Sequence, residues 1–110
     1  MATEFKVLGQ AAPAATTPNN IYTVPASAQA VISTIVVANR SATSATFRIS
    51  VRPNGASQAD QHYLAYDVTV PGNDSTTLTL GVTMGDTDVL TVYGSSATLS
   101  WNVFGTEITP

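Results

Sequence analysis

Few residues of this 110-residue chain could support acid–base, nucleophilic or metal chemistry. His62 is the only histidine, and a catalytic or metal-binding role would require Asp60 or Asp67 close beside it. The chain has no cysteine, and its serines stand in no Gly-x-Ser-x-Gly motif and have no second histidine to act as a base. We therefore expect a partly exposed histidine at the start of a strand, and a protein that is not an enzyme.

Two carboxylates stand close together in the segment Asp86-Thr87-Asp88, directly after Gly85. Such a pair could bind Ca²⁺, but the third and later ligands of a calcium loop are missing from the sequence that follows. The segment therefore favours a hairpin turn, and we expect neither a metal nor another cofactor.

Arg48 and Arg52 are two of only three arginines in the chain, and their spacing puts them on the same face of a strand. Arginine is enriched at protein interfaces because its planar guanidinium binds carboxylates and stacks on aromatic rings. Together with Tyr63 and Asp67 they could form an anchor between subunits. The alternative is a cross-strand pair with Asp60 or Asp67 within one chain, which contributes little stability by itself.

Five aromatic residues raise the question of a sugar-binding platform: Tyr22, Tyr63, Tyr66, Tyr93 and Trp101. Tyr66 and Trp101 are in phase with the apolar residues of their segments, so packing in the core is favoured for both. The platform hypothesis is correspondingly weak.

These residues lie in segments whose apolar and polar residues alternate with the period of a β-strand. The clearest is residues 45–52, and similar runs occupy residues 62–70, 77–80 and 99–103. The predicted core residues are Phe47, Ile49 and Val51; Leu64, Tyr66, Val68 and Val70; Leu78 and Leu80; and Leu99, Trp101 and Val103. Residues 30–38 are apolar on both faces, as expected for a central strand covered on both sides or covered by a neighbouring subunit.

Weaker runs bring the total to about eight short strands, separated by turn sequences such as Arg52-Pro53-Asn54-Gly55 and Pro71-Gly72-Asn73-Asp74. Helical periodicity is almost absent. The sequence therefore predicts an all-β fold, a single antiparallel β-sandwich that is Ig-like or jelly-roll-like.

Residues 9–20 break the alternation, because they are rich in Ala, Thr and Pro and carry no charge. We expect an N-terminal strand and extended linker over residues 1–20 and the sandwich domain over residues 21–110. The first strand either pairs with the sheet edge of a neighbouring subunit, as an arm, or folds back on its own sheet.

Charged residues make up only 10% of the chain. A folded monomer of 110 residues exposes about 5,800 Å² of surface. An interface of about 800 Å² per partner would therefore contain only one or two charged side chains. Such a surface favours assembly, as a dimer or trimer, although a neutral Thr-rich surface can also simply tolerate water. Four cationic residues are too few for general nucleic-acid binding, and no apolar run approaches a membrane span or a signal peptide. We expect neither nucleic acid nor a membrane as a partner.

Residues 21–56, 62–71 and 88–108 resemble small virion structural proteins of tailed bacteriophages, cyanophages among them. The resemblance is carried by Tyr-Thr-Val-Pro-Ala at residues 22–26, Asn-Arg-Ser at 39–41, Arg-Pro-x-Gly at 52–55, His-Tyr-x-Ala-Tyr-Asp at 62–67 and Phe-Gly-x-Glu-Ile at 104–108. It implies a β-sandwich of the phage particle, made in the bacterial host cytoplasm, and it supplies no catalytic residues.

Three functions follow as hypotheses. The first is a capsid cement (decoration) protein that binds the major capsid protein on the outer lattice and stabilises the mature head. The second is a structural component of the tail or baseplate. The third is a module that binds glycans on the host surface through exposed tyrosines.

Overall fold

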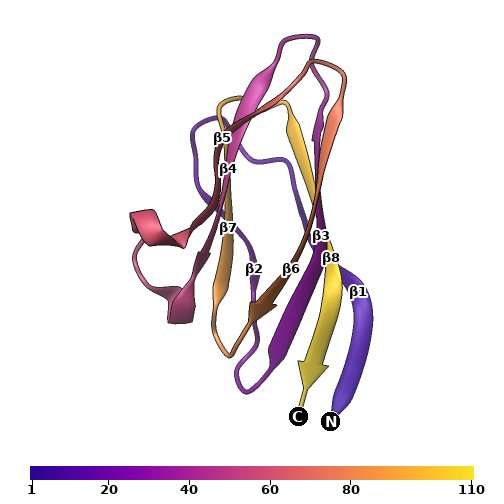
Figure 1. The fold of residues 1–110 in the computed structure, drawn as a ribbon, viewed down its shortest axis with the longest axis vertical. Coiled ribbons are helices and arrows are strands. Elements are labelled where there is room, and N and C mark those ends of the chain that lie inside the picture. The colour runs from indigo at the N-terminus through magenta and orange to yellow at the C-terminus, as the bar shows by residue number, and fades with distance from the viewer.

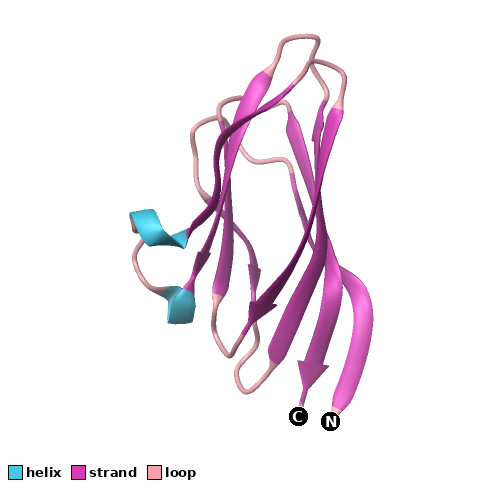
Figure 2. Ribbon diagram, viewed as in Figure 1, coloured by secondary structure: helices cyan, strands magenta, loops and turns pink.

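Eight β-strands make up almost all of the regular structure (Figures 1 and 2). The computed structural model describes residues 1–110. The strands are β1 (Ala2–Ala11), β2 (Asn19–Thr23), β3 (Gln29–Asn39), β4 (Ala45–Arg52), β5 (Tyr63–Val70), β6 (Ser75–Met84), β7 (Val89–Gly94) and β8 (Leu99–Thr109). The helical segments are two 3₁₀ turns, η1 (Pro53–Gly55) and η2 (Asp60–His62), and neither has the length and apolar character needed to cross a bilayer.

The strands form two four-stranded antiparallel sheets, which pack as two layers in Figure 1. The strand orders are β1-β8-β3-β6 and β2-β7-β4-β5. The first strand thus pairs with the last, the second with the seventh, the third with the sixth and the fourth with the fifth. This nested pairing over two sheets is the jelly-roll arrangement. The predicted antiparallel β-sandwich of about eight strands is confirmed, and its topology is that of a jelly roll rather than of an Ig domain.

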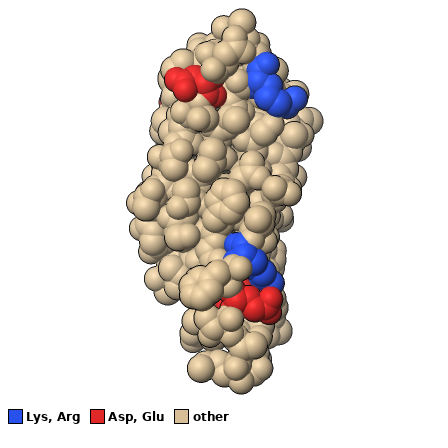
Figure 3. Space-filling view, turned by 90° about the vertical axis from the view of Figure 1, so that its right-hand side faces the viewer, with Lys and Arg blue, Asp and Glu red and all other residues tan.

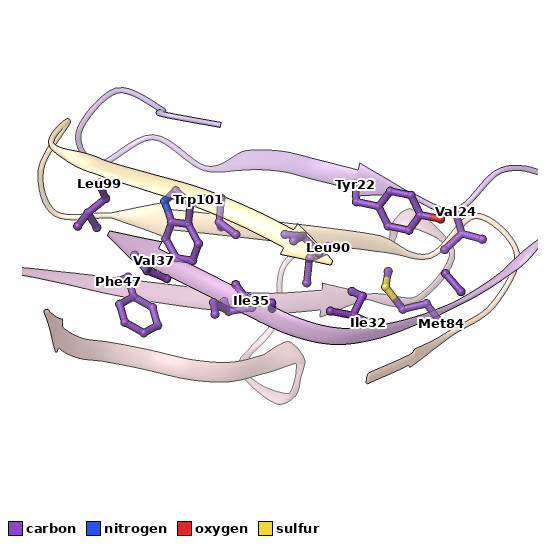
Figure 4. Packing of buried hydrophobic residues seen from close by; sticks show 14 of the residues in the cluster. Tyr22, Val24, Ile32, Ile35, Val37, Phe47, Met84, Leu90, Leu99 and Trp101 are labelled. Carbon is purple, nitrogen blue, oxygen red and sulfur yellow. The ribbon is translucent and has the colours of Figure 1, made fainter. Parts of the chain in front are cut away.

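The core lies between the two sheets and contains the residues that alternate along β4 and β8. Phe47 of β4 and Trp101 of β8 meet edge to face across this space, with ring centres 5.4 Å apart and planes at 89° (Figure 4). Val51 packs at the margin of the same cluster. The predicted core residues that the structure buries on these two strands are Phe47, Ile49, Leu99, Trp101 and Val103.

The predicted core face of β5 is wrong for Leu64 and Tyr66, which are 47% and 56% exposed. Val68 and Val70 lie on the predicted face, opposite Phe47 and Ala45, but only Val70 is buried, and Val68 on this edge strand is 37% exposed. Ala65, which alternates with the predicted core residues and so falls on the opposite face in that pattern, instead packs against the core.

A β-bulge at Asp67 causes this change of phase. Phe47 of β4 pairs with Val68, but Ile49, two residues further along β4, pairs with Ala65, three residues back along β5. Asp67 accommodates the extra residue with a φ of +52°. Because side chains alternate with a period of two, the inserted residue moves Tyr66, Ala65 and Leu64 to the opposite faces. A second register shift, between Ile49 and Ser50 of β4, returns Tyr63 to the outer face, where it pairs with Ser50.

A second irregularity separates the two leucines of β6. Leu78 packs against the core as predicted, whereas Leu80 is 44% exposed. Gly81 has a φ of +63°, and at this point the register between β3 and β6 shifts between Ile32 and Thr34. The prediction that Leu80 lies in the core is therefore wrong, because the register shift lies just beyond Leu78.

The apolar segment 30–38 forms most of β3, which lies between β8 and β6 in its sheet. Ala30, Ile32, Ile35 and Val37 are fully buried against the other sheet. The opposite face of β3 is open: Val31 is 38% exposed. Coverage of both faces by this chain itself is thus excluded, and coverage by a neighbouring subunit stays a prediction.

The N-terminal strand extends into the segment 9–20 and pairs with the last strand of its own chain. β1 runs to Ala11 and pairs with β8 from Ala2 onward, so only residues 12–18 connect it to β2. At Gly9 the backbone passes so close to Ile21 that a Cβ atom would lie 2.5 Å from the Ile21 carbonyl oxygen. In the single chain, residues 1–20 are therefore not a separate arm.

Candidate functional site

The four predicted interface residues lie together on the outer face of the β2-β7-β4-β5 sheet. Arg48 Nε donates to Asp67 Oδ1 at 2.7 Å, and a second nitrogen lies 3.4 Å from Oδ2. The guanidinium carbon of Arg48 also lies 4.1 Å from the ring centre of Tyr66 and 4.6 Å from that of Tyr93. The bulge at Asp67 therefore places a carboxylate opposite Arg48, and the pair is made within one chain.

The hydrogen bond from Arg48 to Asp67 raises the pKa of the Arg48 guanidinium above its ordinary value. Arginine is already protonated throughout the physiological range, so the pair keeps its charge there. Because both side chains are partly exposed, this ion pair contributes little stability by itself.

Arg52 uses nearly all of its donors on uncharged groups. Its Nε donates to Thr91 Oγ1 at 3.1 Å, and one Nη donates to Asn20 Oδ1 at 3.0 Å. The other Nη donates to the carbonyl oxygens of Gly55 and Ala56 at 3.2 and 2.8 Å. Arg52 therefore ties the η1 turn to β2 and β7, and its positive charge has no carboxylate partner.

A pocket of about 170 Å³ opens beside these two arginines, and we call it the arginine pocket. Its lining residues come from β2, β4, β5, β7 and the adjoining loops: Pro18, Asn20, Arg48, Ser50, Arg52, Gln58, Tyr63, Thr91 and Tyr93. Arg48, Arg52 and Tyr63 thus line one pocket, and Asp67 is bonded to Arg48 beside it. Their role as an interface between subunits stays a prediction. The hydroxyls, amides and positive charge of the lining are suited to binding a small polar or anionic group.

Sequence reasoning missed the contributions of Asn20 and Thr91 to this pocket, and it considered Tyr93 only as part of a possible sugar-binding platform. Asn20, Thr91 and Tyr93 are far from Arg48 in the chain and reach it only because β7 pairs with both β2 and β4. The alternation of Thr91 and Tyr93 along β7 was the one available signal, since both point away from the core-facing Leu90 and Val92.

The remaining candidate chemical groups stabilise turns. His62 Nδ1 accepts from the Ala59 backbone amide at 3.1 Å, and the partly exposed histidine ends the η2 turn directly before β5. Asp88 accepts from the backbone amides of Asn54 and Gly85, and Asp86 accepts from that of Ser27. No three His, Cys, Asp or Glu side chains are grouped so that they could hold a metal ion.

A buried carboxylate that the sequence did not reveal lies between the two sheets near the chain ends. Glu107 of β8 is 7% exposed, accepts from Tyr22 Oη at 2.6 Å and forms an ion pair with Lys6 Nζ at 2.9 Å. The hydrogen bonds from Tyr22 and then Lys6 hold the pKa of Glu107 below its ordinary value. The hydrogen bond to Glu107 raises the pKa of the Lys6 ammonium. Burial, together with the hydrogen bond to Glu107, raises the pKa of the Tyr22 hydroxyl.

The outer face of the other sheet is the second candidate surface, and we call it the uncharged face. Cross-strand partners point to the same side of a sheet, so the register assigns its members. Two rows cross all four strands, one of Phe5, Thr106, Val31 and Thr83, and one of Val7, Phe104, Thr34 and Thr79.

The charged residues in these strands all lie on the opposite side of the sheet. Glu4 and Lys6 alternate with Phe5 along β1, and Glu107 alternates with Thr106 along β8. Figure 3 views this side of the molecule, and the broad area between its charged ends contains neither acidic nor basic groups. On this face Phe5 is 84% and Phe104 36% exposed.

Comparison with known proteins gives this chain no relative. No protein-family model, no curated protein and no solved structure matches it.

Proposed function

We propose that this protein is a non-enzymatic structural component of a tailed-phage virion, and specifically a capsid cement protein. In this proposal it binds the major capsid protein on the outer lattice, together with copies of itself, and stabilises the mature head. The uncharged face is the observation on which the proposal rests, and the sequence resemblance to small virion proteins supports its class.

The physical basis is the low cost of removing the uncharged face from water. Burying an unpaired charge costs several kcal/mol, whereas Thr hydroxyls can find new hydrogen-bond partners and Phe and Val gain from burial. The protein exposes 5472 Å² and carries eleven charges, about one per 500 Å². A face that lacks all of them is thus a natural contact surface.

Cement proteins of this design would act by mass action. A protein that binds the mature lattice more tightly than the immature one shifts the equilibrium toward the mature lattice. Many copies, each adding one modest apolar contact, would therefore raise the heat resistance of the particle.

One experiment compares two charge insertions in otherwise similar positions. Thr106 and Thr46 are both partly buried threonines on inner strands, Thr106 on the uncharged face and Thr46 on the outer face of the other sheet. Thr106→Glu should weaken binding to particles that lack the protein by at least about tenfold, since the carboxylate must lose its water. Thr46→Glu should bind as wild type. Equal binding by both variants would show that the uncharged face is not the contact.

Copy number separates a capsid location from a tail location. Hundreds of copies in each purified particle support a cement protein, and a few or a few dozen support a tail or baseplate component. We also expect a chelator to leave binding to particles unchanged, because the proposed contact uses no metal.

The arginine pocket favours a second candidate function, the binding of host-surface glycans. Tyr63 and Tyr93 line it beside the positive charge of Arg52, and sugar rings pack on aromatic faces while their hydroxyls or carboxylates bind polar groups. Binding of the free protein to host cells that is lost in Tyr93→Ala, but kept in Thr106→Glu, would support this candidate instead.

A further inference from the structure

The β1 strand has a backbone edge that nothing in the chain covers. β1 is the outermost strand of its sheet and pairs only with β8. None of the backbone hydrogen bonds outside the strand ladders involves residues 1–11, and residues 1–7 are all exposed. An edge of this kind is a template for pairing with another strand.

The other three sheet edges are shorter or interrupted. β2 has only five residues, β5 contains the bulge at Asp67, and β6 has its register shift near Gly81. On β1, pairing with β8 is continuous from Ala2 to Val7 and shifts only between Val7 and Gly9. This is the longest uninterrupted edge in the molecule.

The charges along this edge are complementary to those of a second, antiparallel copy of the same edge. Glu4 and Lys6 lie on either side of Phe5, and the Glu4 carboxylate makes no ion pair or hydrogen bond within the chain. In an antiparallel pair centred on Phe5, each Glu4 stands directly opposite Lys6 of the second copy. The two exposed Phe5 side chains then oppose each other on the uncharged face.

We propose that two copies of this protein associate by antiparallel pairing of their β1 edges, about a two-fold axis at Phe5. The pairing spans residues 3–7, because beyond them β1 approaches β2 at Gly9. The two β1-β8-β3-β6 sheets become one eight-stranded sheet, in which the two uncharged faces lie on the same side.

The charges of Glu4 and Lys6 favour this register over the two neighbouring registers. Shifting the axis by one residue toward the N-terminus would oppose Glu4 with Glu4, and shifting it the other way would oppose Lys6 with Lys6. Both alternatives place like charges directly opposite each other, which is unfavourable in a sheet. The proposal goes beyond the virion function, because it holds or fails for the purified protein without any particle.

Single cysteines test the register, because the natural chain contains none. Directly opposed residues of antiparallel strands have Cα atoms about 4.5 to 5.5 Å apart, within the range of a disulfide. Phe5→Cys should therefore form a disulfide-linked dimer rapidly under mild oxidation by diamide. Thr3→Cys is the matched control: it is also exposed on the same face, but the two Thr3 positions lie about 14 Å apart along the strands. Equal rates for the two variants would overturn the proposal.

A charge reversal tests the same contact without a covalent bond. Glu4→Lys places two lysine side chains opposite each other at both ends of the pair, and should raise the dimer dissociation constant at least about tenfold in sedimentation equilibrium. Asp60→Lys, on the opposite side of the molecule, makes the same change of charge at an exposed position and should leave dimerisation unchanged. Thermal unfolding of each variant confirms that the fold is kept. A wild-type protein that stays monomeric at tens of micromolar, or a Glu4→Lys variant that dimerises normally, contradicts β1 pairing.

Discussion

At the scale of single residues, Trp101 and Tyr66 show how differently two aromatic side chains from similar sequence patterns can be used. Trp101 is 1% exposed and packs edge to face on Phe47, whereas Tyr66 is 56% exposed and lies against Arg48. The Trp101 Nε1 atom is buried without a hydrogen-bond partner. Its indole therefore stabilises the fold by packing alone.

Truncating Trp101 and Tyr66 should lower the free energy of unfolding by different amounts. Trp101→Ala should lower the free energy of unfolding by about 3 to 5 kcal/mol, because it leaves a cavity between the sheets. Trp101→Phe should cost less, since no hydrogen bond is lost with Nε1. Tyr66→Ala should cost about 1 kcal/mol or less. Urea unfolding measures all three, and a Tyr66→Ala cost as large as that of Trp101→Ala would mean that β5 packs differently.

Glu107 should make stability depend on pH in a predictable direction. Its pKa is lowered in the folded protein, so its contribution is present above its ordinary pKa of 4.5 and is lost as the pH falls through the folded value. Glu107→Gln should therefore be less stable than wild type at pH 7, and the difference should shrink below pH 4.5. Thermal unfolding from about pH 7 to about pH 3 checks this, and a difference that stays constant with pH would contradict it.

Among the elements, the bulge in β5 decides which side chains of that strand pack around Arg48. Asp67 occupies the left-handed region with a φ of +52° and from there bonds to Arg48. The bulge also leaves Tyr66 outside, where it packs on both Arg48 and Tyr63. One irregular residue thus links the register of an edge strand to the contacts that surround Arg48.

Substitutions at Asp67 should separate the ion pair from the backbone conformation. Asp67→Asn and Asp67→Val both lose the carboxylate, but Asn adopts a positive φ readily and a β-branched residue does not. Asp67→Val should therefore be about 1 to 2 kcal/mol less stable than Asp67→Asn in urea unfolding. Equal stabilities would mean that the bulge can move to another residue at no cost.

At the scale of the whole molecule, the few charges are not spread evenly over the surface. The outer face of the β2-β7-β4-β5 sheet has Arg48, Arg52 and Asp67, whereas the uncharged face has none. The two sides of the sandwich are thus suited to different contacts, one polar and specific and the other broad and apolar.

The dissociation constant of the proposed dimer should depend little on salt concentration. Raising NaCl from about 0.1 to about 0.5 M screens the exposed Glu4–Lys6 pairs of the proposed dimer but leaves backbone hydrogen bonds and apolar contacts intact. Sedimentation equilibrium should show the dissociation constant rising by only a few-fold. Complete dissociation at the higher salt concentration would mean that charges, rather than the strand edge and Phe5, hold the copies together.

The sequence alone determined the features that depend on local periodicity. Strict alternation along β4 and β8 identified Phe47, Ile49, Trp101 and Val103 as core residues, because each side chain's face follows from its neighbours in a regular strand. The spacing of Arg48 and Arg52 likewise placed both on one outer face.

Features that depend on strand register and on distant strands are visible only in the folded molecule. The bulges near Asp67 and Gly81 shift the faces of β5 and β6, and neither leaves a periodic signal in the chain. The arginine pocket requires β7 to lie between β2 and β4, and the Glu107 cluster requires β1 and β2 to approach β8. These contacts join residues up to 101 positions apart, so their geometry follows from strand order, which local patterns do not encode.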